Sequence, residues 1–64
     1  MSIKEYRIKA ELRQEDIAQR LNVDRSTVTK WETGVSTPTV DKLIAMSKIF
    51  GCTVDELLGV SDEK

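Results

Sequence analysis

The feature that most constrains this chain is a pair of helical segments joined by only three residues, within the stretch from Gln14 to Trp31. A link as short as residues 22–24 forces two helices to cross steeply instead of lying antiparallel. Such a crossing needs a small residue at the contact, which Ala18 supplies, and a turn residue that tolerates positive φ, which Asn22 supplies. The apolar residues placed to fix both helices to a core are Ile17, Leu21, Val23, Val28 and Trp31.

A further helix is predicted before this pair. Ile3, Tyr6 and Ala10 lie at helical spacing, which indicates one apolar face. Ser2 and Glu5 form a capping box, a pattern that is typical of a helix start.

Start and stop signals bound the next two helices. Asp24 caps the helix that contains Trp31, and Gly34 ends it at a position that tolerates a left-handed backbone. After Pro38, Thr39 caps another helix, which Gly51 ends. The inward residues expected of that helix are Val40, Leu43, Ile44, Ser47 and Phe50.

The end of the chain predicts one more short helix. Thr53 and Glu56 form a second capping box, and Leu57 and Leu58 follow as apolar residues. The sequence contains no signal for a strand, because it has neither a sustained alternation of apolar and polar residues nor an Asn-Gly hairpin turn. The fold class is therefore predicted to be all-α, with five helices.

Length and composition limit what such a chain forms. Sixty-four residues make one domain, predicted over residues 1–60, with residues 61–64 as a short polar tail. The single cysteine, Cys52, cannot form an internal disulfide, and no Cys/His cluster offers a zinc site. Stability must therefore come from packed helices, and no metal or cofactor is expected.

The sequence offers little for catalysis or for membrane insertion. Histidine is absent, and neither a glycine-rich phosphate loop nor a nucleophile elbow is present. We therefore expect no enzyme, and no small-molecule effector in so small a core. No apolar run approaches the roughly 20 residues that span a bilayer, and no signal peptide opens the chain. A cytoplasmic protein without a membrane partner is predicted.

The stretch from Gln14 to Glu32 resembles the helix-turn-helix of the Cro/lambda-repressor-like family, also called the xenobiotic-response-element family. Residues 3–7 are similar to the first helix of that family, 34–38 to its loop, and 40–58 to its last two helices. The resemblance implies a sequence-specific regulator of transcription, by preference a repressor, that binds double-stranded DNA. Because one recognition helix covers only a few base pairs, we expect a homodimer on a near-palindromic operator.

A few positions depart from the family pattern. Asn22 stands where glycine is usual in the turn, and Glu11 where glycine is common near the end of the first helix. Arg13 stands where Ser or Thr usually caps the second helix, and its side chain cannot accept a hydrogen bond from a backbone N–H of the first turn. We expect Asp16 to supply the reciprocal half of the capping box. The loop 35–37 is not basic, which lowers the expected number of phosphate contacts.

The resemblance assigns DNA contacts to individual residues. Family docking places the helix of about residues 25–33 in the major groove, where the fork of Arg25 suits guanine O6 and N7. Each assigned residue is also compatible with an ordinary solvated position. The residues expected to contact bases are Arg25, Ser26, Thr29 and Lys30, and those expected to contact phosphates are Arg13, Gln14 and Thr33.

Two further groups of residues have structural assignments. Arg7 and Glu32 fall where family members pair an arginine of the first helix with a glutamate of the third, which braces the recognition helix; the alternative is two unrelated surface charges. Cys52, Val54 and Val60 lie where related domains meet, so they are the predicted dimer interface. The alternatives are that Val54 completes the core of one subunit and that Cys52 senses redox state.

The distribution of charge only mildly supports DNA binding. The formal net charge is −1. Residues 1–32 carry seven Lys/Arg and six Asp/Glu, whereas residues 33–64 carry three and five, which favours the first half as the DNA face. The acidic balance and the loop without basic residues favour a rival function, a protein-interaction module of the antitoxin or anti-repressor type. Gln14, Arg25 and Lys30 oppose it.

Overall fold

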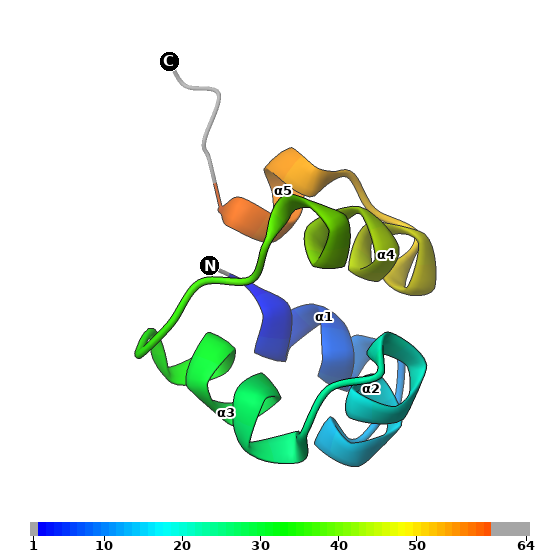
Figure 1. The fold of residues 1–64 in the computed structure, drawn as a ribbon. Coiled ribbons are helices and arrows are strands. Elements are labelled where there is room, and N and C mark those ends of the chain that lie inside the picture. The colour runs from blue at the N-terminus through cyan, green and yellow to red at the C-terminus, as the bar shows by residue number, and fades with distance from the viewer. Residues whose placement is uncertain (1, 60–64) are drawn as a thin grey trace.

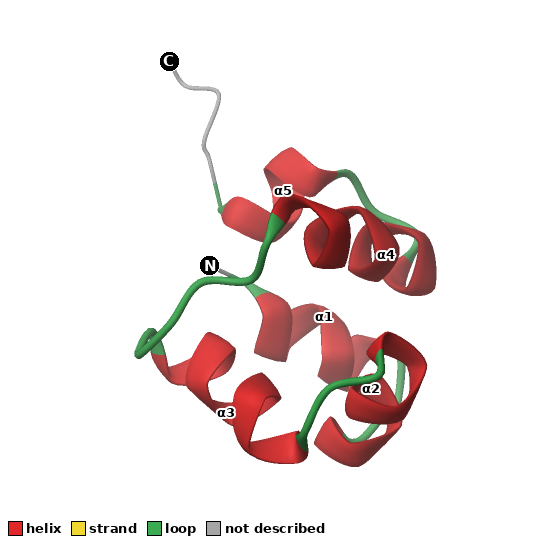
Figure 2. Cartoon of the chain, in the orientation of Figure 1, coloured by secondary structure: helices red, strands yellow, loops and turns green. Residues whose placement is uncertain are grey.

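The computed structural model describes residues 2–59, and these form five helices and no strand (Figure 2). The predicted all-α fold class is confirmed. Residues 60–64, which include Val60 and the predicted tail, lie outside the described residues. No helix of the described part is long and apolar enough to span a membrane. The helices are α1 (Ile3–Lys9), α2 (Gln14–Leu21), α3 (Arg25–Thr33), α4 (Val40–Phe50) and α5 (Val54–Leu58).

The helices pack as two pairs around α1. Helix α2 contacts α3, and α4 contacts α5, while α1 packs against both α3 and α5 (Figure 1). A further contact joins α2 to α4. The pair α2–α3 is the predicted helix-turn-helix; α1 contacts its second helix and α4 its first, while α5 packs on α1 and α4.

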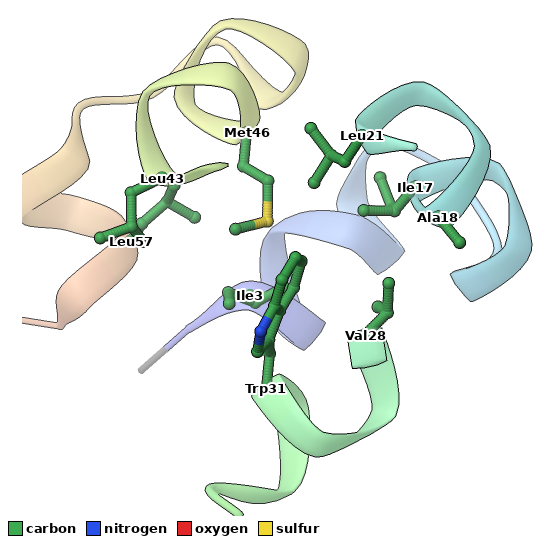
Figure 3. Packing of buried hydrophobic residues seen from close by; sticks show 9 residues of the cluster. All are labelled: Ile3, Ile17, Ala18, Leu21, Val28, Trp31, Leu43, Met46 and Leu57. Atoms are coloured by element: carbon green, nitrogen blue, oxygen red, sulfur yellow. The ribbon is translucent and has the colours of Figure 1, made fainter. Parts of the chain in front are cut away.

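One apolar cluster lies between all five helices (Figure 3). Trp31 of α3 and Met46 of α4 lie in it, with exposed fractions of 5% and 0%. Burial of large apolar side chains of this kind stabilises a domain by about 1.5–3 kcal/mol each. The buried residues are Ile3, Ile17, Ala18, Leu21, Val28, Trp31, Leu43, Met46 and Leu57.

The predicted inward face of α4 is partly wrong. Leu43 is buried as expected, but Val40 and Ile44 are 68% and 43% exposed, and Met46 takes the inward position. Apolar residues occur on more than one side of this helix, so the spacing alone allowed two faces. The contacts with α5 and α2 selected the face of Leu43 and Met46.

The turns confirm two predictions about backbone conformation. Asn22, between α2 and α3, has φ 58° and ψ 46°, so this residue adopts the left-handed conformation expected of it. Gly34 ends α3 with φ 83°; no heavy atom lies within 4 Å of a Cβ built there, so only its backbone conformation favours glycine. Glu11, after α1, is also left-handed, with φ 58°. This third turn explains why Ala10 is exposed and not inward, because the helix has already ended at Lys9.

The predicted helix starts have mixed outcomes. Both bonds of the Thr53–Glu56 capping box are present, at 2.8 and 3.1 Å, and Thr39 also caps its helix. The capping box at Ser2 is wrong. The N–H of Ser2 donates to the carbonyl oxygen of Leu57 at 2.8 Å, so it is not available to Glu5. The side chain of Asp24 accepts no capping bond, although the helix starts after it as predicted.

Candidate nucleic-acid interface

Helix α3 has one buried side and one exposed side. Val28 and Trp31 anchor it to the core, and Asn22 and Ala18 allow α2 to lie close against it. All five residues assigned to DNA on this helix therefore lie together on its outer side. These exposed residues are Arg25, Ser26, Thr29, Lys30 and Thr33.

The predicted contact between Arg7 and Glu32 is present. Arg7 Nε lies 2.7 Å from Glu32 Oε2, and the side chains are only 14% and 4% exposed. Arg7 also donates from Nη1 to the carbonyl oxygen of Leu12 at 2.9 Å. A charge pair this poorly hydrated relies on complete pairing, because a lone buried charge is costly. The pair ties α1 to the end of α3.

Gln14 connects this pair to the exposed side of α3. Its Nε2 donates to Glu32 Oε1 at 2.9 Å, while its Oε1 accepts from Thr29 Oγ1 at 3.1 Å and Arg25 Nε at 3.5 Å. Because a carboxylate only accepts hydrogen bonds, Glu32 fixes which end of the Gln14 amide faces it. Arg25 still has both terminal amino groups free of Gln14, and one hydrogen of Gln14 Nε2 remains for a phosphate oxygen.

Two threonine hydroxyls of α3 are already engaged within the protein. Thr29 Oγ1 donates to Gln14, and Thr33 Oγ1 donates to the carbonyl oxygen of Thr29 at 2.9 Å. A phosphate oxygen needs a donor, so Thr33 would contact one only after its hydroxyl turns away from the helix. Ser26 and Lys30 make no side-chain hydrogen bond with residues 2–59.

A notch of about 270 Å³ lies at the start of α2, and we call it the α2 notch. Arg13 is 75% exposed there and lies 3.4 Å from both Glu15 Oε1 and Asp16 Oδ2. Asp16 also accepts the backbone N–H of Arg13 at 2.8 Å, the half of the capping box that the sequence predicted. This bond lowers the pKa of the Asp16 carboxyl. The lining residues are Arg7, Arg13, Gln14, Glu15 and Arg25.

Two of the three residues assigned to a dimer interface lie at the start of α5. Cys52 and Val54 are half-buried and pack against the core of their own subunit, and Val60 lies outside the described residues. Burial and the nearby Glu56 carboxylate raise the pKa of the Cys52 thiol. A raised pKa keeps the thiol protonated near neutral pH, which does not favour a redox sensor. The dimer interface stays a prediction.

Sequence reasoning missed two contacts that organise this region. The internal bonds of Gln14 span 15 and 18 residues, and no local pattern signals bonds over such separations. Lys42 of α4 donates from Nζ to the carbonyl oxygen of Leu21 at 2.9 Å, so it closes the end of α2. A lysine at that position of α4 gives no sign of this contact in the sequence.

Comparison with known proteins assigns the family. The chain matches the family described as Helix-turn-helix over residues 3–57, and it therefore belongs to that family. The predicted resemblance to the Cro/lambda-repressor type is confirmed. No solved structure matches the chain at a significant level.

Three relatives illustrate the range of the family. The HTH-type transcriptional activator BcrR of Enterococcus faecalis is 39% identical over 88% of this chain and 28% of its own length. The 26 kDa repressor protein of Escherichia phage HK022 is 37% identical over 80% of this chain and 22% of its own. An uncharacterized HTH-type transcriptional regulator of Methanocaldococcus jannaschii is 31% identical over 97% of this chain and 94% of its own length. The chain thus spans about a quarter of the first two relatives.

Proposed function

We propose that this chain is a regulator of transcription that binds double-stranded DNA at specific sequences, with α3 in the major groove. The observation that carries the proposal is the exposed side of α3. Arg25, Ser26, Thr29 and Lys30 share that side, and the opposite side is fixed to the core. Relatives named as an activator and as repressors of transcription support the same reading.

The α2 notch supports a docking in which the backbone of the duplex runs past the start of α2. Gln14 and Arg13 offer donors there, and the first-turn N–H groups of a helix favour a phosphate oxygen. With few unpaired basic groups, each subunit neutralises only two or three phosphates. We therefore expect log K to fall with log salt with a slope of roughly −4 to −5 for a bound dimer.

Selection of bound duplexes from a random pool tests the proposal directly. A preferred, near-palindromic sequence supports it, and the selected duplex then serves as operator in gel shifts at two salt concentrations. If neither the pool nor genomic fragments yield a bound duplex at low salt, the DNA-binding proposal is wrong. The protein-interaction module then becomes the better explanation. Reporter expression with the operator overlapping a promoter separates repression, which the sequence favoured, from activation.

The homodimer belongs to this proposal. One recognition helix covers only a few base pairs, and two-fold pairing doubles the contacts, with half-sites about 34 Å apart. We propose the start of α5, at Cys52 and Val54, as the interface, because related domains meet there. The competing surface is the outer side of α4, where Val40 and Ile44 are exposed.

Two matched substitutions decide between these surfaces. Val54→Asp is expected to lower the mass in solution and weaken binding to the full palindrome, whereas Ile44→Asp is expected to change neither. A folded Val54→Asp variant that keeps its oligomeric state and binds full palindromes tightly would show that the interface lies elsewhere. The cytoplasmic location predicted from the sequence stays part of this proposal.

A further inference from the structure

Three guanidinium groups and one carboxylate line the α2 notch, and they belong to Arg7, Arg13, Arg25 and Glu15. Arg7 is paired with Glu32, which does not line the notch, and Arg25 Nε donates to the amide oxygen of Gln14. Arg13 lies 3.4 Å from two carboxylates, those of Glu15 and Asp16. A phosphate oxygen that approaches Arg13 therefore meets no unbalanced positive charge unless one of these carboxylates moves away.

Only one of these carboxylates makes no hydrogen bond that holds the fold. Glu32 is 4% exposed and holds Arg7 and Gln14, and Asp16 accepts the backbone N–H that begins α2. Glu15 is 51% exposed, and its contact with Arg13 Nη1, at 3.4 Å, is the one ion pair or side-chain hydrogen bond it makes within residues 2–59. Exposed ion pairs of this length are weak, so a stronger anion displaces such a carboxylate.

We propose that Glu15 limits the affinity of this chain for double-stranded DNA by competing with a phosphate group for the guanidinium of Arg13. The inference rests on the proposed function. In the free protein the carboxylate of Glu15 lies 3.4 Å from Nη1 of the Arg13 guanidinium. On DNA the phosphate takes that place, and the displaced carboxylate stays beside it as a like charge.

The consequence is a loss of affinity that is nearly independent of sequence. Phosphate contacts carry no base information, so a residue that opposes them weakens operator and unrelated DNA alike. Glu15 thereby lowers the time the chain spends on unrelated DNA, and the base contacts expected of Arg25 decide where it stays. This accounts for a DNA-facing surface in a chain whose formal net charge is −1.

Glu15→Gln tests the inference, because glutamine keeps the shape and the helix propensity of glutamate. At about 50 mM salt we expect roughly 3- to 10-fold tighter binding to the selected operator and to an unrelated duplex of equal length. The salt slope is expected to steepen by about one unit or less, since the displaced carboxylate no longer offsets the charge of Arg13 beside the phosphate. Thermal unfolding followed by circular dichroism checks that the variant remains folded.

Three companion variants make the result specific. Asp41→Asn removes one negative charge from the exposed first turn of α4, a helix that carries none of the residues assigned to DNA or to the dimer interface, and it is expected to leave the affinity unchanged. In Arg13→Gln, adding Glu15→Gln is expected to give less than half of the original gain. An equal gain from Asp41→Asn, or an undiminished gain without Arg13, would overturn the inference, because Glu15 would then act only through net charge.

The outcomes also separate this inference from the proposed function. If the wild-type chain and Glu15→Gln both bind no duplex at low salt, the proposed function fails and the inference fails with it. If the wild type binds its operator but Glu15→Gln binds neither duplex more tightly, only the inference fails.

Discussion

Helices α2 and α3 begin differently from helices α4 and α5. The latter pair each start with a threonine whose side-chain oxygen accepts a backbone N–H of the first turn, at 3.5 Å for Thr39 and 3.1 Å for Thr53. At the matching positions of α2 and α3, Arg13 and Asp24 accept no such bond. In α4 and α5 a hydrogen bond between residues only three positions apart therefore caps the helix start.

The start of α2 keeps one local bond, from the N–H of Arg13 to Asp16, and is otherwise held by residues far away in the sequence. Gln14 binds Glu32 and Thr29 of α3, and Glu32 in turn binds Arg7 of α1. The first-turn N–H that a capping side chain would accept donates to a backbone carbonyl instead, from Asp16 to Arg13 in α2 and from Thr27 to Asp24 in α3, each at 3.0 Å. The difference teaches that local caps serve the helices that complete the core, whereas long-range polar bonds hold the helices of the candidate interface.

The largest test of this comparison removes the long-range anchor. Glu32→Ala leaves the poorly exposed Arg7 without its charge partner and Gln14 without its acceptor. We expect the free energy of unfolding to fall by about 3 kcal/mol. Urea unfolding at low temperature measures it. The local counterpart, Glu56→Ala, should lose about 1 kcal/mol or less. Equal losses from the two variants would remove the distinction between the two halves.

A second test separates binding from stability at the start of α3. Arg25→Ala is expected to weaken operator binding by about 1–3 kcal/mol per half-site and to relax the preference at one base pair. Its stability should stay the same or rise slightly, since a first-turn arginine opposes the helix dipole. Lys48→Ala, which removes an equal charge from α4, is the control. Equal losses of affinity from both would mean that Arg25 reads no base.

A third test compares two caps directly. Thr53→Ala removes a side chain that accepts a backbone bond, so we expect a loss of about 1 kcal/mol in the free energy of unfolding. Asp24→Ala removes a side chain that accepts none, so its effect should be clearly smaller. Thermal unfolding of the two variants side by side decides the matter. A larger loss from Asp24→Ala would contradict the assignment of the two helix starts.

The smallest expected effect concerns pH. The backbone bond from Arg13 lowers the pKa of Asp16 below its ordinary value of 3.8. The carboxylate therefore stabilises the folded state fully above that value, and this contribution is lost as pH falls through the lowered pKa. Wild type should be more stable than Asp16→Asn at pH 6, and the difference should shrink toward pH 2.5. A difference that stays constant over this range would show that the bond does not stabilise the fold.

The sequence predicted most of the fold because the decisive signals are local. The periodic apolar residues, Asn22 in the turn, and the glycines after α3 and α4 placed the helices. It predicted the exposed side of α3 for the same reason, since a helix with Val28 and Trp31 inside must turn Arg25 and Lys30 outward. The sequence-based prediction failed where a distant residue took the place of a local hydrogen-bond partner. At Ser2, the N–H donates to the carbonyl oxygen of Leu57 and not to Glu5.

What the sequence determined by itself is the set of helices, most of their ends and the class of fold, because these depend on spacing and on backbone preference within a few residues. Only the tertiary structure decided which face of α4 is buried, how the amide of Gln14 is oriented, and that the carboxylate of Glu15 pairs with the guanidinium of Arg13. The physical reason is range. A side-chain bond between residues 18 positions apart, such as Gln14 to Glu32, exists only after the core has brought their helices together.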